Sequence, residues 1–424
     1  MKKRLLPLLL CACAPAHAGL EITVAGGETA ARPIAVVPFA QPADAGTNLA
    51  EIISADLARS GQFQPLAPSD MLEKPTDAAQ VNFRNWRVLG VDSVVVGQMR
   101  RGGGKLTVRF QLLDVLRAQT LAGYEVEVAD PRRLRPAAHQ IADLIYEKLT
   151  GVPGYFNSQI AYVAASGQPQ NRLFQVVVAD ADGVNPVTVA TSREPLMSPA
   201  WSPDRRQLAY VGFERGRSAI YVHTLASGEL RRLVQEKGIN GAPAWSPDGR
   251  QLAVTLSFER NPDIYVIDVA TNTRRQLTQH FAIDTEPAWS PDGRQIAFTS
   301  DRGGQPQIYV VNAAGGEARR ITFEGKQNLR ARYAPDGKSL ALVNVDETGY
   351  RIGVLDLASR ALRLVSSGPL DESPSFAPNG AVVIYAAQGR QGAELATVTV
   401  DGRIRQRLSQ PGDVREPTWS SLIR

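Results

Sequence analysis

The sequence predicts an N-terminal α/β domain followed by a six-bladed β-propeller, with four-stranded antiparallel blades and a ring closed by the C-terminal strand. The first observation is a block of the form aromatic-Ser/Ala-Pro-Asp/Asn-Gly, complete or truncated, that returns along the second part of the chain. Its aromatic residues are separated by 44, 44, 44, 43 and 43 positions, a spacing typical of propeller blades. They are Trp201, Trp245, Trp289, Tyr333, Phe376 and Trp419. The second observation is the less regular pattern of strands and helices that precedes these blocks.

Each repeat contains the strands of one blade. After Trp245, a Pro-Asp-Gly turn is followed by alternating or apolar segments at 251–254, 264–266 and 274–277. Together with the strand that carries the aromatic residue, they make the four short strands of a blade. Pro, Asp and Gly suit successive positions of a tight turn, so the recurring Asp residues are explained by turns rather than by a shared metal. We interpret the aromatic residue as filler between adjacent blades.

Two incomplete repeats complete one another. Residues 159–163, 173–178 and 186–189 match the second, third and fourth strands of a blade that lacks its innermost strand. Residues 419–421, Trp-Ser-Ser, supply an innermost strand without the other three. The two fragments together close a ring of six blades, and closure removes exposed sheet edges.

The segment 19–152 is predicted to form the α/β domain, with an N-terminal tail at 19–32, and the propeller is predicted at 153–424. Strand-like segments lie at 20–24, 33–38, 91–99, 106–113 and 124–128. Asn48 and Glu51 form a capping pair for a helix that ends before Gly61, and a second helix stops at Gly151. Residues 151–154 then make a short, fairly stiff connection to the propeller.

Residues 1–18 are predicted to be a secretory signal that is cleaved after Ala18. A basic start, a run of about ten apolar residues and the small-x-small sequence Ala16-His17-Ala18 indicate this. A less favoured alternative is a lipoprotein box with a lipidated Cys13. Loss of the basic start lowers the formal charge from +5 to +2, which argues against a nucleic-acid partner. Both cysteines, Cys11 and Cys13, belong to this segment, so no disulfide or zinc-thiolate site is expected after cleavage.

The sequence predicts no catalytic residue, no cofactor site and no metal site. It contains no Gly-x-Ser-x-Gly or His-Glu-x-x-His motif, and beyond the signal its histidines are His139, His223 and His280. Each of these is expected to be structural or solvated. The segment 101–105, Arg-Gly-Gly-Gly-Lys, lacks the spacing of a phosphate-binding loop and is interpreted as a hairpin turn.

The signal, the small α/β domain and the six repeats of the Pro-Ala-Trp-Ser-Pro-Asp-Gly type resemble the TolB family, the periplasmic propeller proteins of the Tol-Pal system, over essentially the whole chain. The resemblance implies a non-enzymatic, monomeric periplasmic protein without a cofactor. It implies that the propeller binds the lipoprotein Pal and that the N-terminal region binds TolA, in support of outer-membrane integrity and of invagination at cell division. A propeller that binds small molecules or glycans is the alternative. A propeller enzyme would need a His-rich channel or an appended hydrolase domain, and the sequence shows neither.

The resemblance also implies two sets of contact residues. In a propeller, the loops from the outermost strand of one blade to the innermost strand of the next surround one mouth of the canal. The Pal-contacting residues expected in these loops are Asn240, Gly241, Ala242, Asp284, Thr285, Glu286, Asn328, Arg330, Asp371, Glu372, Arg415 and Glu416. Some family members carry His before the Asn, where this chain has Ile239. The TolA-contacting residues are expected in a strand-like segment that can pair with a partner, dock on its own protein or form an edge strand of the α/β domain. They are Leu20, Glu21, Ile22, Thr23 and Val24.

Overall fold

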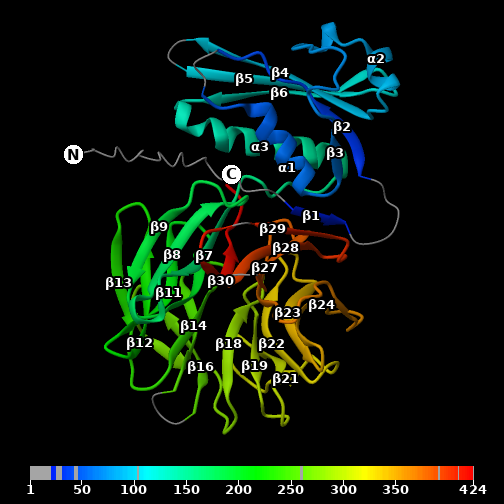
Figure 1. Ribbon diagram of the computed structural model, residues 1–424. Helices are drawn as coiled ribbons and strands as arrows, with labels where there is room; N and C mark the ends of the chain where they lie inside the picture. The colour runs from blue at the N-terminus through cyan, green and yellow to red at the C-terminus, as the bar shows by residue number, and fades with distance from the viewer. Residues whose placement is uncertain are drawn as a thin grey trace, which may run out of the picture.

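The structure is a computed structural model that describes residues 31–42, 46–102, 105–257, 261–389, 392–408 and 410–423, together with the backbone of 21–24. The predicted signal at 1–18 lies outside the described residues, as does Leu20. Figure 1 shows an α/β unit above a β-propeller. This architecture confirms the predicted fold class.

The α/β unit is built on a mixed sheet of five strands. They are β2 (Arg32–Val36), β3 (Phe63–Pro65), β4 (Ser93–Gly102), β5 (Lys105–Asp114) and β6 (Gln119–Val128). Their order in the sheet is β3-β2-β4-β5-β6, with β2 parallel to both of its neighbours and the remaining pairs antiparallel. β4 and β5 form the hairpin that the sequence predicts around 101–105, because Gly102 pairs with Lys105.

Helices lie on both faces of this sheet. The helical segments of the unit are α1 (Leu49–Arg59), η1 (Ala78–Gln80), α2 (Phe83–Val88), η2 (Pro131–Arg133) and α3 (Leu134–Thr150). α1 and α3 lie between the sheet and the propeller (Figure 1). α2 was not predicted from the sequence, and it packs Trp86 on the opposite face, against Val94 and Val96. Among the described residues, no helix has the length and apolar character needed to cross a bilayer.

The ends of the two long helices follow the sequence prediction. Asn48 caps α1 by accepting the backbone N–H of Glu51 (3.3 Å). α3 ends at Gly151, which adopts the left-handed conformation (φ 77°) that glycine reaches without strain.

Each blade of the propeller has four strands that follow one another from the central canal outwards, and they are named in that order. Blade 1 contains β30 (Asp413–Trp419), β7 (Gln159–Ser166), β8 (Leu173–Asp180) and β9 (Val187–Ser192), with η3 (Pro169–Asn171) between β7 and β8. Blade 2 contains β10 (Leu196–Trp201), β11 (Gln207–Glu214), β12 (Arg217–Thr224) and β13 (Glu229–Val234). Blade 3 contains β14 (Asn240–Trp245), β15 (Gln251–Leu256), β16 (Asp263–Asp268) and β17 (Arg274–Gln276).

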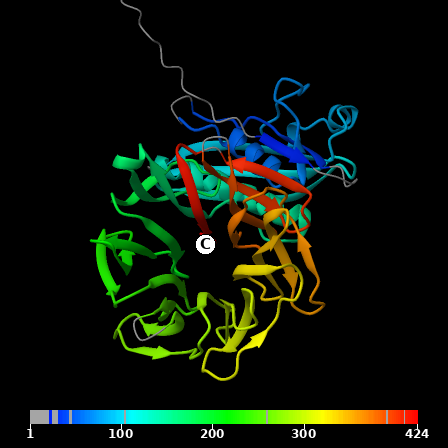
Figure 2. The same cartoon turned by 60° about the horizontal axis from the view of Figure 1, so that its bottom comes forward.

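The remaining blades continue the ring in the same sense. Blade 4 contains β18 (Asp284–Trp289), β19 (Gln295–Ser300), β20 (Gln307–Asn312) and β21 (Arg319–Arg320). Blade 5 contains β22 (Gln327–Tyr333), β23 (Ser339–Asp346), β24 (Gly349–Asp356) and β25 (Leu362–Leu364). Blade 6 contains β26 (Glu372–Phe376), β27 (Val382–Gln388), β28 (Ala393–Thr399) and β29 (Ile404–Leu408). Figure 2 shows the blades arranged around the central canal.

β30 closes the ring. It pairs antiparallel with β7, so that Trp419 stands opposite Ile160. The Trp419 indole donates its N–H to Ser158 Oγ (2.8 Å) and meets the Tyr155 ring edge-on. The split first blade and its completion by the C-terminal strand are therefore confirmed.

The aromatic residue at the end of each innermost strand packs between blades. Trp201 of blade 2 lies in one apolar cluster with Val163 of blade 1, and Trp245 of blade 3 lies in one with Val211 of blade 2. The Trp245 indole also donates to the carbonyl oxygen of Ala200 (3.1 Å). These contacts agree with the interpretation of the aromatic residues as filler.

β1 (Glu21–Val24) adds a fifth strand to blade 6. It runs antiparallel to β29, with Glu21 opposite Arg407 and Val24 opposite Ile404. The alternative that this segment is an edge strand of the α/β domain is therefore wrong, and the segment docks on the propeller of its own chain. In Figure 1, β1 lies beside β29 and below the helices of the α/β unit.

Candidate partner-binding site at the canal mouth

The innermost strands of the six blades share one irregularity at the same end of the canal. Each strand shifts register against its neighbour, as between Gly241 and Ala244 in β14. Within each shift, one residue has a left-handed backbone with φ between 49° and 57°. These six residues, which we call the mouth ring, are Ser198, Ala242, Glu286, Arg330, Ser373 and Glu416. None of them is glycine, although this conformation costs a non-glycine residue roughly 1–2 kcal/mol.

A cavity of about 590 Å³ opens inside the mouth ring. Its lining includes all members of the ring and the aromatic residue that follows each member three positions later. Seven of the residues expected to contact Pal lie on its wall: Asn240, Gly241, Ala242, Thr285, Glu286, Arg330 and Glu416. Glu372 and Arg415 line a separate cavity of about 300 Å³ beside blade 6. The structure thus brings seven of the twelve predicted residues together and places two at another cavity, whereas Asp284, Asn328 and Asp371 line neither.

Four of the predicted residues occupy equivalent, buried positions where the loops enter the innermost strands. They are Asn240, Asp284, Asn328 and Asp371. The amide of Asn240 donates to the carbonyl oxygens of Ser218 (3.0 Å) and Glu236 (2.9 Å), and Asp284 Oδ2 accepts from Arg302 Nη2 (2.7 Å). These side chains hold the mouth loops in place from within the blades.

Arg330 connects several blades across the canal. Its Nε lies 2.7 Å from Glu286 Oε1, its Nη1 donates to Ser373 Oγ, and its Nη2 lies 3.5 Å from Glu416 Oε1. Burial alone would lower the pKa of Arg330, but Glu286 and Glu416 outweigh that effect and raise it. The guanidinium is therefore a fixed positive charge inside the mouth.

The carboxylates of the mouth ring also bind backbone. The Glu416 carboxylate accepts the backbone N–H of Ser198, and Glu286 Oε2 accepts the backbone N–H of Arg330 (3.0 Å). In both cases the acceptor belongs to the preceding blade and the donor is the next member of the ring.

A second arginine, Arg332, is half-buried in the cavity wall. Its Nη1 donates to the carbonyl oxygen of Ala331 (2.9 Å), and burial lowers the pKa of Arg332. Among the described residues no carboxylate lies at hydrogen-bond distance from it, so this cation favours an incoming anion.

Exposed apolar side chains stand on the loops around the mouth. Phe281 is 86% exposed, and its ring centroid lies 4.2 Å from that of His280. The exposed apolar residues in the loops that enter blades 3 to 6 are Ile239, Phe281, Ile283, Phe323 and Leu370. Exposed apolar side chains that gather around a cavity mark a surface that can bind another protein.

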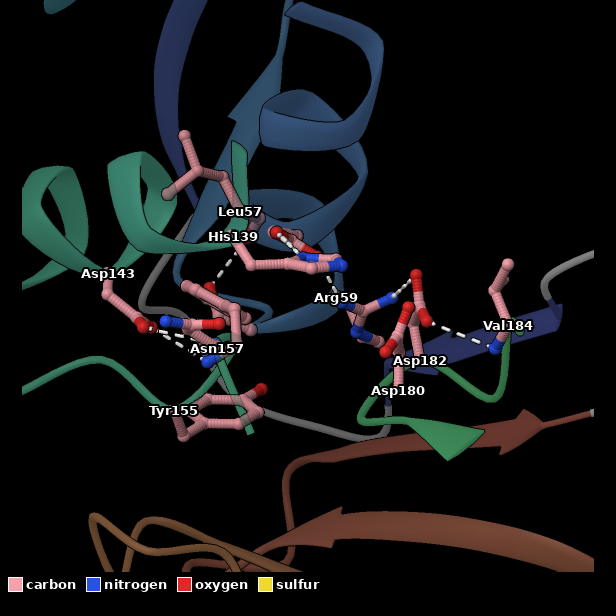
Figure 3. Close-up of polar contacts among 12 residues, drawn as sticks. Leu57, Arg59, His139, Asp143, Tyr155, Asn157, Asp180, Asp182 and Val184 are labelled. Carbon is pink, nitrogen blue, oxygen red and sulfur yellow. Dashed lines mark hydrogen bonds and ion pairs between the residues drawn. The ribbon is translucent and has the colours of Figure 1, made fainter. Parts of the chain in front are cut away.

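A second group of charged residues joins the α/β unit to blade 1 (Figure 3). We call it the joint, and its members are Asp56, Arg59, Arg135, His139, Asp180 and Asp182. His139 Nδ1 lies 2.6 Å from Asp56 Oδ2, and Arg59 pairs with Asp56 and lies 3.7 Å from Asp182. Asp56 and Arg59 come from α1 and His139 from α3, whereas Asp182 follows β8 of the propeller.

Burial and charge act in opposite directions on the joint residues. Burial would lower the pKa of His139, but the hydrogen bond and the charge of Asp56 outweigh it and raise that pKa. Burial would raise the pKa of Asp182, but Arg59, His139 and Arg135 outweigh it and lower that pKa. At Asp180, by contrast, burial and the charge of Asp182 raise the pKa, so the joint stabilises the charges of His139 and Asp182 but not that of Asp180.

The joint also holds a set of atoms of the kind that bind metals. His139, Asp180 and Asp182 place a ring nitrogen and carboxylate oxygens within 4.8 Å of one another. Arg135, however, donates to both carboxylates, with its Nε 3.1 Å from Asp180 Oδ2. Both carboxylates of this set are thus already engaged by a guanidinium group, and the joint fastens the two parts of the molecule.

The fold and the canal mouth define the chain as a six-bladed propeller protein with an N-terminal α/β unit. A family model described as the TolB beta propeller domain matches residues 146–423, and a model described as the TolB amino-terminal domain matches residues 20–121. The chain belongs to the TolB family.

Relatives and a solved structure agree with this membership. The Tol-Pal system protein TolB of Methylococcus capsulatus is 61% identical over 97% of each chain. That of Thioalkalivibrio sulfidiphilus is 57% identical over 100% of this chain and 99% of its own. The crystal structure of TolB from Acinetobacter baumannii superposes with a TM-score of 0.87 at 39% identity, and the match covers 95% of this chain and 100% of that one.

The sequence analysis did not identify two members of the mouth ring, the second arginine of the cavity wall or any ion pair of the joint. Ser198 and Ser373 belong to the mouth ring, and Arg332 lies between the ring and its aromatic residue. The signal for both serines was present, because each stands three positions before the aromatic residue of its block, as Glu286 does. The joint left no such signal, since Asp56 and His139 are 83 positions apart in the chain.

Proposed function

We propose that the protein is a non-enzymatic periplasmic component of the Tol-Pal system. In this proposal it binds Pal at the canal mouth and TolA through its N-terminal segment, and so supports outer-membrane integrity and invagination during cell division. Family membership supports the assignment to the system, because the relatives are named Tol-Pal system proteins. The observation that carries the Pal part is the mouth itself, a cavity with charged walls inside an apolar rim.

The chemistry of the mouth suits a protein partner. The exposed Phe281 and its apolar neighbours offer area whose burial favours association. The charges of Glu286, Arg330 and Glu416 lie at the centre, where polar contacts fix orientation and discriminate between partners. Arginine and aromatic side chains are the residues that most often carry the binding energy of an interface, and the mouth presents both in Arg330 and Phe281.

The TolA part rests on β1. An extended segment that pairs through its backbone with β29 can pair in the same way with a strand of another protein. The segment is docked on blade 6 in this structure, so binding of TolA through the same backbone edge would require it to leave β29.

Co-purification from envelope extracts tests both parts. Tagged mature protein should retain Pal and TolA, and Ala242→Arg and Thr285→Arg should each weaken Pal binding by roughly tenfold or more, about 1.4 kcal/mol. Neither change should lower the melting temperature, because Ala242 and Thr285 lie on the cavity wall rather than in the core. Removal of 19–32 should weaken TolA binding and leave the melting of the propeller intact. If both arginine variants bind Pal like the parent, the Pal site lies elsewhere.

A further inference from the structure

The mouth ring contains a repeated device for holding carboxylates. At Ser198 and at Arg330, the backbone N–H of a left-handed residue donates to a glutamate of the preceding blade. The two acceptors, Glu416 and Glu286, are themselves mouth-ring residues. The six blades repeat the same register shift, so equivalent backbone positions recur around the ring. We call each of these N–H groups a carboxylate seat.

Two neighbouring seats follow a ring residue that carries no carboxylate. The seat at Ala242 follows Ser198 of blade 2, and the seat at Glu286 follows Ala242 of blade 3. Neither Ser198 nor Ala242 can therefore repeat the contact that Glu286 makes with Arg330.

The seats at Glu286 and Glu416 each carry a glutamate of their own, whose negative charge repels a second carboxylate. At Ser373, the side chain accepts a hydrogen bond from the Arg330 guanidinium, which is already paired with Glu286. An incoming anion is therefore favoured at the seat of Ala242 in blade 3.

Backbone conformation supports a functional reason for these positions. At the other end of the same strands, the left-handed position of the turn is glycine at Gly249, Gly293, Gly337 and Gly380. At the mouth no member of the ring is glycine, although the φ angles demand the same left-handed region. Strain of this kind at a cavity wall is typical of sites where the side chain or the exposed backbone is used.

We propose that the backbone N–H group of Ala242 seats an acidic side chain, an aspartate or glutamate of the protein partner, that enters the canal mouth. This inference rests on the proposed function in taking Pal as that partner. The incoming carboxylate would accept this N–H group, as Glu416 and Glu286 accept those of Ser198 and Arg330, and the positive charge of Arg332, which lines the same cavity, would favour it. Binding of this kind selects a partner by one buried acidic residue.

The chain offers a direct way to fill the seat from within. Ser198→Glu places a glutamate one blade before Ala242, in the arrangement that Glu286 and Glu416 already show. Glutamate is accepted by this backbone, because Glu286 and Glu416 hold φ angles of 57° and 51° where Ser198 has 50°. Pal binding should fall by about tenfold to a hundredfold, the range expected for loss of hydrogen bonds to a charged group. The melting temperature should stay within a few degrees of the parent.

A matched variant separates the seat from a general charge effect. Ser373→Glu adds the same charge to the same ring on the other side of the canal, and it should weaken Pal binding at most about threefold. The seat is wrong if Ser198→Glu binds as tightly as the parent, or if Ser373→Glu loses as much as Ser198→Glu. In the second half of the test, each acidic residue of Pal is changed to Asn or Gln. The residue that enters the seat is the one whose change weakens binding to the parent, and the same change should not weaken binding to Ser198→Glu any further. The seat is also wrong if no acidic residue of Pal behaves in this way.

A last arm does not depend on Pal. N-acetylglutamate at millimolar concentration should shift the amide NMR signal of Ala242 in the parent and not in Ser198→Glu. That shift without Pal binding would reject the proposed partner and keep the seat. Absence of the shift in the parent would overturn the seat even if Pal binds.

Discussion

The canal mouth and the joint contain the same kinds of side chain, yet they are built for different tasks. At the mouth, Arg330 reaches Glu286 and Glu416 along the wall of a cavity of about 590 Å³. At the joint, Asp56 is fully buried and His139 is 2% exposed, and their partners lie on three elements that are packed together. Charged side chains that face a cavity can exchange their ion-pair partner for a group of a bound molecule. Charged side chains that are buried between packed elements can only hold those elements together. The difference lies in access rather than in residue type.

β30 belongs to the mouth and closes the ring, so its loss should have the largest effect. Deletion of 415–424 removes Glu416 from the mouth and abolishes the contacts of Trp419 with Ser158 and Tyr155. We expect unfolding to become easier by several kcal/mol, on the scale of a buried Trp truncation, because β7 becomes an exposed edge and β26 loses the strand packed beside it in the ring. Thermal unfolding measures this effect. Unchanged stability would contradict a ring closed by the C-terminal strand.

A pair of isosteric substitutions compares the two regions directly. Asp56→Asn removes the charge that holds Arg59 and His139 at the joint, and loss of one member of a buried ion pair costs about 3–5 kcal/mol. Glu416→Gln removes a charge that faces the cavity, and it should cost about 1 kcal/mol or less. Denaturant unfolding of both variants gives the two values. Equal losses would show that the mouth charges are as structural as those of the joint.

The two regions should also differ in their response to pH. The folded pKa of His139 lies above its unfolded value of 6.5, so its contribution to stability is complete below about pH 6.5 and is lost as pH rises through the folded pKa. Burial raises the pKa of Asp143, beside the joint on α3, to about 7, against an unfolded value of 3.8. The folded state therefore keeps a proton that the unfolded chain releases, and this group also removes stability as pH rises from about 4 to 7.

Urea unfolding between about pH 5 and pH 9 measures this dependence. The unfolding free energy of the parent should decrease with rising pH across this window. His139→Gln should decrease less steeply above pH 6.5, whereas Glu416→Gln should follow the parent, because its change lies outside the joint. A His139→Gln curve parallel to that of the parent would remove His139 as a source of the dependence.

The regular part of the molecule could be predicted from the sequence, and the parts that depend on packing could not. The spacing from Trp201 to Trp419 determined the number of blades, and the pairing of β30 with β7 confirmed how the ring closes. Loop position and the family resemblance placed Asn240 and Asp284 among the expected contact residues, but they could not show that these side chains are buried inside the blades. The joint arises only when α1, α3 and the loop after β8 come together, and no local pattern encodes that contact.

The smallest expected effect concerns a position that belongs to neither region. In the turn after β10, Arg205 holds φ 59° at the place where later blades carry glycine, such as Gly249 at φ 71°. Left-handed backbone costs a non-glycine residue roughly 1–2 kcal/mol, and substitution by glycine removes this cost. Glycine also adds conformational freedom to the unfolded chain, which offsets part of the stabilisation. Arg205→Gly should therefore stabilise the protein by about 0.5–1 kcal/mol, and Gly249→Arg should destabilise it by a similar amount.

This turn and the mouth lie at opposite ends of the same strand. Arg205→Gly therefore relieves backbone strain at a position that has no part in binding, which distinguishes it from the backbone strain at the mouth. Differential scanning calorimetry gives the stability change, and Pal binding should remain equal to that of the parent. By contrast, Ser198→Gly would relieve the same kind of strain at the mouth. If Arg205→Gly lowered the stability instead, the Arg205 side chain would have to make contacts worth more than its backbone strain. The difference between glycine-rich turns and a glycine-free mouth would then lose its value as a sign of function.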